Sequence, residues 1–276
     1  MSFLEALMQG IIQGLTEFLP VSSSGHLSLY QHFTGNNGEG ALLFSAVLHL
    51  GTLVAVFIAF RKTICELLVE LFYLIKDIFT GKFKWKAMNP QRRAIIMMVI
   101  SLAMLIPFYI FKDYFERAAE DSDIIIEGLC FLYTSVILFI SDRCVKGNKK
   151  FGDITTKNAV TVGTFQGIAL LPGISRSGST ISSGLFCGFE RETAVQYSFI
   201  LGIPAILGGC LLQVKDAVEQ KALEFDFVNF AVGFIVSAIV GICAIKMVNW
   251  LVKSDKFKVF AIYTLSLIHI SEPTRH

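Results

Sequence analysis

The chain has 276 residues, of which 54% are hydrophobic and only 17% are charged. An average soluble domain is about 25% charged, so this composition excludes an ordinary soluble globular protein. The 24 Lys and Arg residues nearly cancel the 22 Asp and Glu residues, and no basic run is long enough to favour nucleic acid as a partner. The composition therefore indicates an integral membrane protein.

Apolar stretches that approach the length of a transmembrane helix, about 20 residues, recur along the chain. In chain order they are Ala41–Phe60, Ala94–Phe111, Ile124–Ser141, Tyr197–Val214, Phe227–Val248 and a last stretch that begins near Val259. Two further apolar stretches, Phe3–Tyr30 and Ala159–Phe186, are each broken near the middle by Pro and by a cluster of Ser and Gly. We expect each of these two to form a pair of half-length helices, a re-entrant hairpin.

The loops between these stretches differ in the sign of their charge. Arg61–Arg93, Asp142–Asn158 and Lys246–Lys258 carry an excess of Lys and Arg, whereas Asp113–Asp123 and Lys215–Val228 carry an excess of acids. The positive-inside rule therefore predicts that the first three loops are cytoplasmic and that the last two lie outside. These signs alternate as they must if six segments span the membrane and both broken stretches re-enter on their own side.

The six cysteines show no CxxC spacing and mostly fall within or beside the apolar stretches. They are best interpreted as small packing residues. Neither a disulfide framework nor a zinc site is expected.

The end of the chain, Ser266–His276, does not fit the pattern of spans. Only about 12 apolar residues follow Val259 before the polar residues 271–276, too few to cross a bilayer. The tail resembles translated sequencing-adapter sequence, and we expect it to be non-native.

An internal repeat relates the two halves of the chain at an offset of 153 residues. Gly10–Gly14 falls on Gly163–Gly167, and Ser22–Gly25 falls on Ser175–Gly178 without a gap. The sequence predicts a single all-α membrane domain built from two repeats, at about 1–150 and 151–265, each with one re-entrant hairpin and three spans. An odd number of spans inverts the second repeat relative to the first.

The two break regions are expected to meet near the middle of the bilayer and to form one site. Backbone N–H groups at half-helix N-termini offer partial positive charge and unpaired donors to an anion. Serine hydroxyls add donors, and glycine permits close approach of the backbone. This combination favours a phosphate ligand.

Few ionisable residues occur near the two breaks: only Glu17 and His26 between Gly10 and Tyr30, and only Arg176 between Ala159 and Phe189. A charge at bilayer depth costs about 2.5–3.5 kcal/mol, so each is a functional candidate. A buried Glu17–Arg176 pair that only fastens the two halves is the alternative, but it leaves His26 and the many serines unexplained. Gln13 and Glu17 are four residues apart and share a helix face. His49 has no polar neighbour along its span and is interpreted as structural.

Two motifs, LTEFLPVSSSGH at Leu15–His26 and PGISRSGST at Pro172–Thr180, closely resemble the signatures of the undecaprenyl-pyrophosphate phosphatases of the bacitracin-resistance type. The resemblance extends to about Tyr263. It implies an enzyme of the bacterial plasma membrane that hydrolyses a polyprenyl diphosphate, undecaprenyl diphosphate, at a site facing the outer side. It further implies a divalent cation, Mg²⁺ or Ca²⁺, and allows a homodimer.

The resemblance matches the family's catalytic residues to Glu17, Ser23, His26 and Arg176, with Glu17 as base or cation ligand. Residues expected to bind the substrate are Gln13, Ser22, Ser24, Gly25, Ser175, Ser177, Gly178 and Thr180. Gln13 departs from the glutamate that many members carry there, which puts a metal or base role at that position in doubt. The residues leave open whether Ser23 attacks phosphorus or orients a water. A transporter or lipid flippase is the alternative, because inverted repeats with broken helices are typical of transporters.

Overall fold

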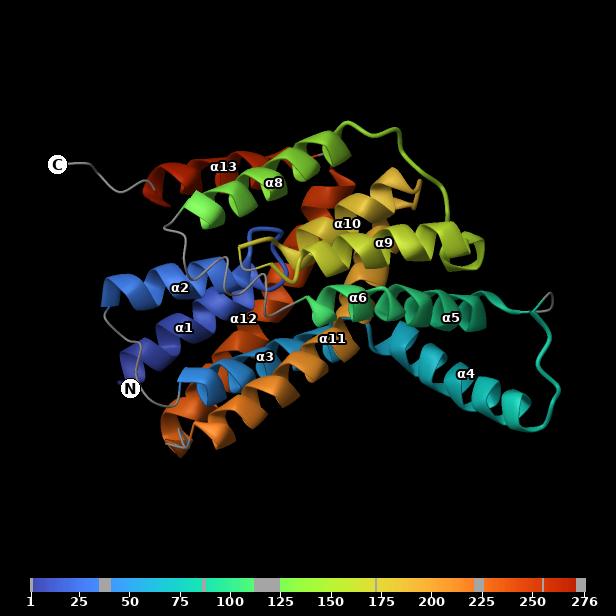
Figure 1. Cartoon of the computed structure of the whole chain (residues 1–276), viewed down its shortest axis with the longest axis horizontal. Coiled ribbons are helices and arrows are strands. Elements are labelled where there is room, and N and C mark those ends of the chain that lie inside the picture. The colour runs from blue at the N-terminus through green and yellow to red at the C-terminus, as the bar shows by residue number, and fades with distance from the viewer. Residues whose placement is uncertain are drawn as a thin grey trace.

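Helices make up the long regular elements of the computed structural model of the chain (Figure 1). The structure describes residues 2–34, 41–85, 88–111, 125–171, 173–220, 226–254 and 256–271. The loop predicted at Asp113–Asp123 and the residue Pro172 lie outside this part. In order, the elements are α1 (Phe3–Thr16), α2 (Ser23–Thr34), α3 (Ala41–Ala59), α4 (Arg61–Phe79), α5 (Pro90–Ala103), α6 (Leu105–Ile110), α8 (Ile125–Asp142), the 3-10 turn η2 (Phe151–Asp153), α9 (Thr156–Ile168), α10 (Arg176–Phe186), α11 (Arg191–Glu219), α12 (Phe227–Lys253) and α13 (Lys258–Ser271).

Four segments of the described chain are long and apolar enough to cross a membrane: Leu42–Ala59, Pro90–Ile110, Arg191–Glu219 and Phe227–Lys253. They coincide with four of the six predicted spans. The other two predicted spans are the apolar helices α8 and α13, which lie side by side (Figure 1) and are shorter in their described parts. The described chain contains no β-strand, and the protein is an all-α, multi-pass membrane protein.

Each of the two broken stretches forms a pair of helices, α1 with α2 and α9 with α10. Glycines let the first helix of each pair approach a distant helix closely. A Cβ atom on Gly14 would lie 2.8 Å from the carbonyl oxygen of Ser237 in α12, and one on Gly163 would lie 2.8 Å from the Cβ of Met104 beside α5. The first broken stretch thus packs on a late span and the second on an early one, which brings the two breaks together.

The segment Arg61–Arg93, expected to be a connecting loop, contains the helix α4, which runs obliquely away from the bundle (Figure 1). Its polar side is tied to α5, since Arg92 binds Glu70 through Nε at 2.5 Å and Asp77 through Nη1 at 2.8 Å. Another side carries exposed apolar residues, Leu68, Phe72, Ile75 and Phe79. The sequence did not predict this helix, because its acidic and basic residues interrupt the apolar run and the segment was interpreted from its charge as a loop.

The three basic loops meet at one end of the bundle. The Nε of Arg93 donates to the carbonyl oxygen of Ile154 at 2.7 Å, which joins the first basic loop to the second. The backbone N–H of Phe257 donates to Asp142 at 2.9 Å, which joins the third to the second. Segments predicted from charge to share a side of the membrane therefore share an end of the molecule.

Candidate active site

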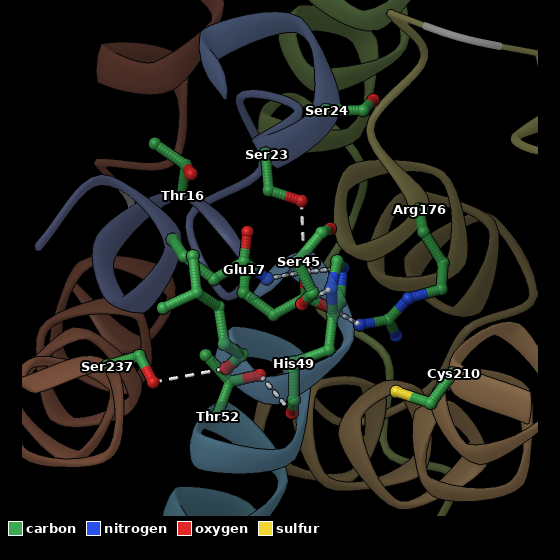
Figure 2. Close-up of polar contacts among 12 residues, drawn as sticks. Thr16, Glu17, Ser23, Ser24, Ser45, His49, Thr52, Arg176, Cys210 and Ser237 are labelled. Carbon is green, nitrogen blue, oxygen red and sulfur yellow. Dashed lines mark hydrogen bonds and ion pairs between the residues drawn. The ribbon is translucent and has the colours of Figure 1, made fainter. Parts of the chain in front are cut away.

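Glu17 is the centre of a buried polar cluster formed by both breaks (Figure 2). Its side chain is 5% exposed, and its Oε1 accepts a hydrogen bond from Arg176 Nη2 at 2.6 Å. Its Oε2 accepts from Ser23 Oγ at 2.9 Å and from Gln13 Nε2 at 3.0 Å. The expected meeting of the two motifs and the shared face of Gln13 and Glu17 are confirmed.

The end of α1 positions Glu17. Its backbone is still helical, and its N–H donates to the carbonyl of Gln13, so the side chain continues the helix face that carries Gln13. The next residue, Phe18, is fully buried and packs edge-on against Phe199 of α11 at a centroid distance of 5.2 Å. Because Phe18 is anchored in the core, the carboxylate is held at the break.

Ser22 turns the chain from the first break into α2. Its φ of 69° lies in the left-handed region that favours glycine, a conformation that costs about 1–3 kcal/mol and is concentrated at functional sites. Its Oγ accepts from the N–H of Gly25 at 3.4 Å and lies 3.3 Å from Ser24 Oγ. This turn places Ser23 at the first position of α2, with its hydroxyl directed at Glu17 (Figure 2).

Ser175 plays the same part at the second break, where it caps the N-terminus of α10. Its Oγ accepts from the N–H of Gly178 at 3.1 Å and lies 3.3 Å from Ser177 Oγ. These contacts repeat those of the first break at the offset of 153 residues. The hydroxyl of Ser177 also donates to the carbonyl of Leu19, so the two breaks touch directly.

Arg176 begins α10 and reaches across to Glu17. Its guanidinium lies against Gly202 of α11, where a Cβ atom would collide with it. One guanidinium nitrogen, Nη1, is buried and has no hydrogen-bond partner among the described residues. That nitrogen is a hydrogen-bond donor left without an acceptor among the described residues.

His49 also belongs to this cluster, so the expectation that it has no polar neighbour is wrong. Its Nδ1 lies 2.8 Å from the carbonyl oxygen of Ser45, which can only accept, so Nδ1 carries the proton. Its Nε2 then faces Glu17 Oε2 at 3.7 Å (Figure 2). The polar neighbour comes from another segment of the chain, which a reading of the span alone does not reveal.

His26 is directed away from Glu17. Its Nδ1 lies 2.7 Å from the carbonyl oxygen of Ser22, and its Nε2 lies 2.9 Å from the hydroxyl of Tyr263 in α13. The two rings are stacked at 5.7 Å. Both ring nitrogens are therefore engaged outside the Glu17 cluster.

A cavity of about 230 Å³ opens beside the cluster. Most of the predicted site residues line it, together with His49: Glu17, Ser22, Ser23, Ser24, Ser175, Arg176 and Ser177. Gln13 is buried behind Glu17, and Gly25 and Gly178 supply the N–H groups bound by the capping serines. Thr180, expected to bind substrate, instead donates to the carbonyl of Arg176 and contacts Ser198 at 2.5 Å, so it supports Arg176 from behind.

Fold and site together define a multi-pass membrane protein with a polar cluster and a cavity where two broken apolar stretches meet. The chain belongs to the bacitracin resistance protein BacA family, whose model matches residues 6–269. It is 38% identical over 264 residues to an undecaprenyl-diphosphatase of Alkaliphilus metalliredigens (96% of this chain, 95% of the relative). It is 39% identical over 268 residues to undecaprenyl-diphosphatase 4 of Bacillus thuringiensis subsp. konkukian (97% and 95%). It is 40% identical over 266 residues to an undecaprenyl-diphosphatase of Desulforapulum autotrophicum (95% and 95%).

Proposed function

We propose that the protein hydrolyses undecaprenyl diphosphate to undecaprenyl phosphate and inorganic phosphate, and so recycles the lipid carrier of cell-wall synthesis in the bacterial plasma membrane. The observation that carries this function is the contact of Ser23, Glu17 and Arg176 beside a cavity within the membrane domain. The relatives are named undecaprenyl-diphosphatases, which supports the same substrate.

The second break binds the diphosphate. Arg176 offers its buried Nη1, and a guanidinium can hold phosphate oxygens in a planar fork. The N-termini of α2 and α10 and the serines at the two breaks add donors. Phosphoryl transfer depends mainly on such positioning and on stabilisation of spread negative charge.

Ser23 and Glu17 form a nucleophile and base pair at 2.9 Å. In the covalent route, Ser23 Oγ bonds to the terminal phosphorus and its proton passes to Glu17. The bond from that phosphorus to the bridging oxygen breaks, and the electron pair leaves with undecaprenyl phosphate. Water then hydrolyses the phosphoserine. In the direct route, Ser23 orients a water that Glu17 deprotonates.

Proton transfer by His26 stays a prediction. In this structure both of its ring nitrogens are engaged, Nδ1 by the carbonyl of Ser22 and Nε2 by the hydroxyl of Tyr263. Release of His26 from Tyr263 on substrate binding would free Nε2 for that role.

A divalent cation fits the donor set on one side of the cluster. Mg²⁺ is typically bound by one or two carboxylates together with substrate phosphates. Glu17 is the one carboxylate among the described residues lining the cavity, and the neighbouring Gln13 has a buried Oε1 without a partner in the described chain. Glu17 would hold Mg²⁺ or Ca²⁺ together with the substrate phosphates, and the cation would neutralise phosphate charge.

An inverted repeat with two re-entrant hairpins accounts for the contacts at the breaks. It is supported by the equivalent capping bonds of Ser22 and Ser175 and by the packing of α1 on α12 and of α9 on α5. The cavity runs along α11 toward Gln213, away from the end where Arg191 binds the basic loop. With the basic end in the cytoplasm, the site faces outward.

Labelling of intact cells tests this orientation. On a cysteine-depleted background, an impermeant thiol reagent should label Glu219→Cys and miss Lys84→Cys, two exposed positions at opposite ends of the molecule. Labelling of Lys84→Cys alone would put the cavity mouth in the cytoplasm.

Lipid transport without turnover is the rival function. The Ser23–Glu17 pair favours the enzyme, because transport does not require a hydroxyl held on a base. Phosphate release from undecaprenyl diphosphate by purified protein in detergent decides between them. Substrate binding without phosphate release would support the carrier.

A further inference from the structure

Helix α4 presents an apolar face that the described part of the chain leaves open (Figure 1). Four residues that follow the helical period along this face are each between 46% and 87% exposed: Leu68, Phe72, Ile75 and Phe79. A contiguous exposed apolar patch marks an interaction site. The helix does not itself cross the bilayer, because six of its 19 residues are charged. A helix with this division of apolar and charged residues is typical of one that lies along a membrane surface.

The charges of α4 are divided between two sides of the helix. All three acidic residues accept hydrogen bonds from side chains at the start of α5: Glu66, Glu70 and Asp77. The three basic residues are exposed and form no ion pair among the described residues: Arg61, Lys62 and Lys76. By helical spacing, Arg61 lies on the same face as Leu68, and Lys76 follows Phe72 by one turn. The apolar face is therefore flanked by positive charge that nothing in the described chain neutralises.

The two tryptophans of the chain mark the level of the membrane surface at the basic end of the bundle. Trp85 follows α4 and is 54% exposed, and Trp250 lies near the end of α12 and is 58% exposed. The Nζ of Lys256 lies 5.4 Å from the centroid of the Trp250 ring. Exposed tryptophan beside lysine is typical of the boundary between lipid and water. Because α4 leads directly to Trp85, it lies close to this boundary.

We propose that α4 lies along the bilayer surface and binds anionic phospholipids, with its apolar face among the acyl chains and its basic residues on the headgroups. Anionic headgroups supply the countercharge that the basic residues of α4 lack, and they attract Lys and Arg at a membrane surface. A second copy of the chain on this face would instead bring like charges together. This lipid site is independent of the proposed function, because it involves neither break.

Quenching of tryptophan fluorescence by brominated phospholipids tests the site. The reporter is Phe72→Trp on the apolar face, in a chain whose native tryptophans are replaced by Trp85→Phe and Trp250→Phe. The full chain is placed in vesicles of phosphatidylcholine and phosphatidylglycerol, with one or the other lipid brominated. Ile239→Trp on the same background is the control reporter, since Ile239 is an exposed apolar residue in the middle of the spanning helix α12.

Brominated phosphatidylglycerol should quench Phe72→Trp more strongly than brominated phosphatidylcholine. We expect a relative binding constant of about five or more in favour of the anionic lipid, because each basic residue at an anionic surface contributes about fivefold. Ile239→Trp should show about equal quenching by the two lipids. Added to the Phe72→Trp reporter, Lys76→Gln should lower the preference by about threefold to fivefold. Lys215→Gln, which removes an exposed lysine from α11 near its C-terminal end, should leave the preference unchanged.

Three results would overturn the lipid site. Equal quenching of Phe72→Trp by the two lipids would show that the helix does not select anionic headgroups. An unchanged preference in Lys76→Gln would show that the basic residues of α4 do not bind them. Absence of quenching by either lipid, while Ile239→Trp is quenched, would assign the apolar face to a second copy of the chain or to water.

Discussion

The first break, at Glu17–Ser22, and the second, at Ala169–Ser175, share the same hydrogen bonds at the start of the helix that follows. They differ in the functional groups that their side chains carry. At each break a serine accepts the N–H of the glycine three residues later and contacts the serine two residues later. At the offset of 153 residues, however, Glu17 corresponds to Leu170, Ser23 to Arg176 and His49 to Gly202.

This division explains how a charged cluster can be buried. A lone carboxylate or guanidinium is costly at membrane depth, and a partner of opposite charge offsets that cost. One break supplies the carboxylate of Glu17 and the hydroxyl of Ser23, and the other supplies the guanidinium of Arg176. Gly202 leaves the space that Arg176 occupies, whereas the equivalent position in α3 carries His49 against Glu17.

The largest effect should follow loss of the Ser23 hydroxyl at the first break. Ser23→Ala should lower turnover by about a thousandfold or more if Ser23 attacks phosphorus. Ser24→Ala is the control, because Ser24 lines the cavity but does not contact Glu17. Phosphate release is measured, and acid quench should trap a phosphoserine at Ser23. Robust turnover by Ser23→Ala would assign the attack to water.

A smaller effect is expected at the equivalent position of the second break. Arg176→Lys keeps the charge but loses the planar fork, so turnover should fall by at least about tenfold, or about 1.4 kcal/mol of transition-state stabilisation. The same assay measures it. Unchanged turnover would mean that Arg176 only fastens the two halves through Glu17.

Gly202→Ala tests the space that distinguishes α11 from α3. The added methyl group would meet the far end of the Arg176 side chain. Because that flexible side chain can move aside, the fold should stay stable, but Arg176 would be misplaced and turnover should fall. We expect a loss of turnover of about threefold to tenfold, since small misplacements of positioning groups are costly, and a nearly unchanged Tm. Gly208→Ala, in open space, is the control; an equal loss there would refute the argument.

The smallest effect concerns the serine–glycine hydrogen bond that both breaks share. Ser175→Ala removes an N-cap and should lower the free energy of unfolding by about 1 kcal/mol. Ser22→Ala should lower the free energy of unfolding by less than Ser175→Ala does. The hydrogen bond from Gly25 to Ser22 is longer than the one from Gly178 to Ser175, 3.4 Å against 3.1 Å. Thermal unfolding in detergent measures both. A loss of stability in Ser22→Ala alone would mean that the equivalent hydrogen bonds at the two breaks do not play the same role.

Much of the site was predictable because it depends on local spacing. The breaks follow from Pro, Ser and Gly within apolar stretches, and the common face of Gln13 and Glu17 follows from the helical period. The pairing of Glu17 with Arg176 was predictable from the repeat and from the cost of unpaired charge in a membrane. Composition and apolar length were sufficient for the all-α membrane class.

The tertiary structure alone decided which distant residues join the site. His49 and Gly202 reach it because α3 and α11 pack around the breaks, and His26 turns away because α13 brings Tyr263 to it. Periodicity describes the faces of one helix, whereas these contacts depend on how helices far apart in the chain cross. The sequence by itself therefore determined the chemistry available at the two breaks, and packing determined which side chains share the cavity.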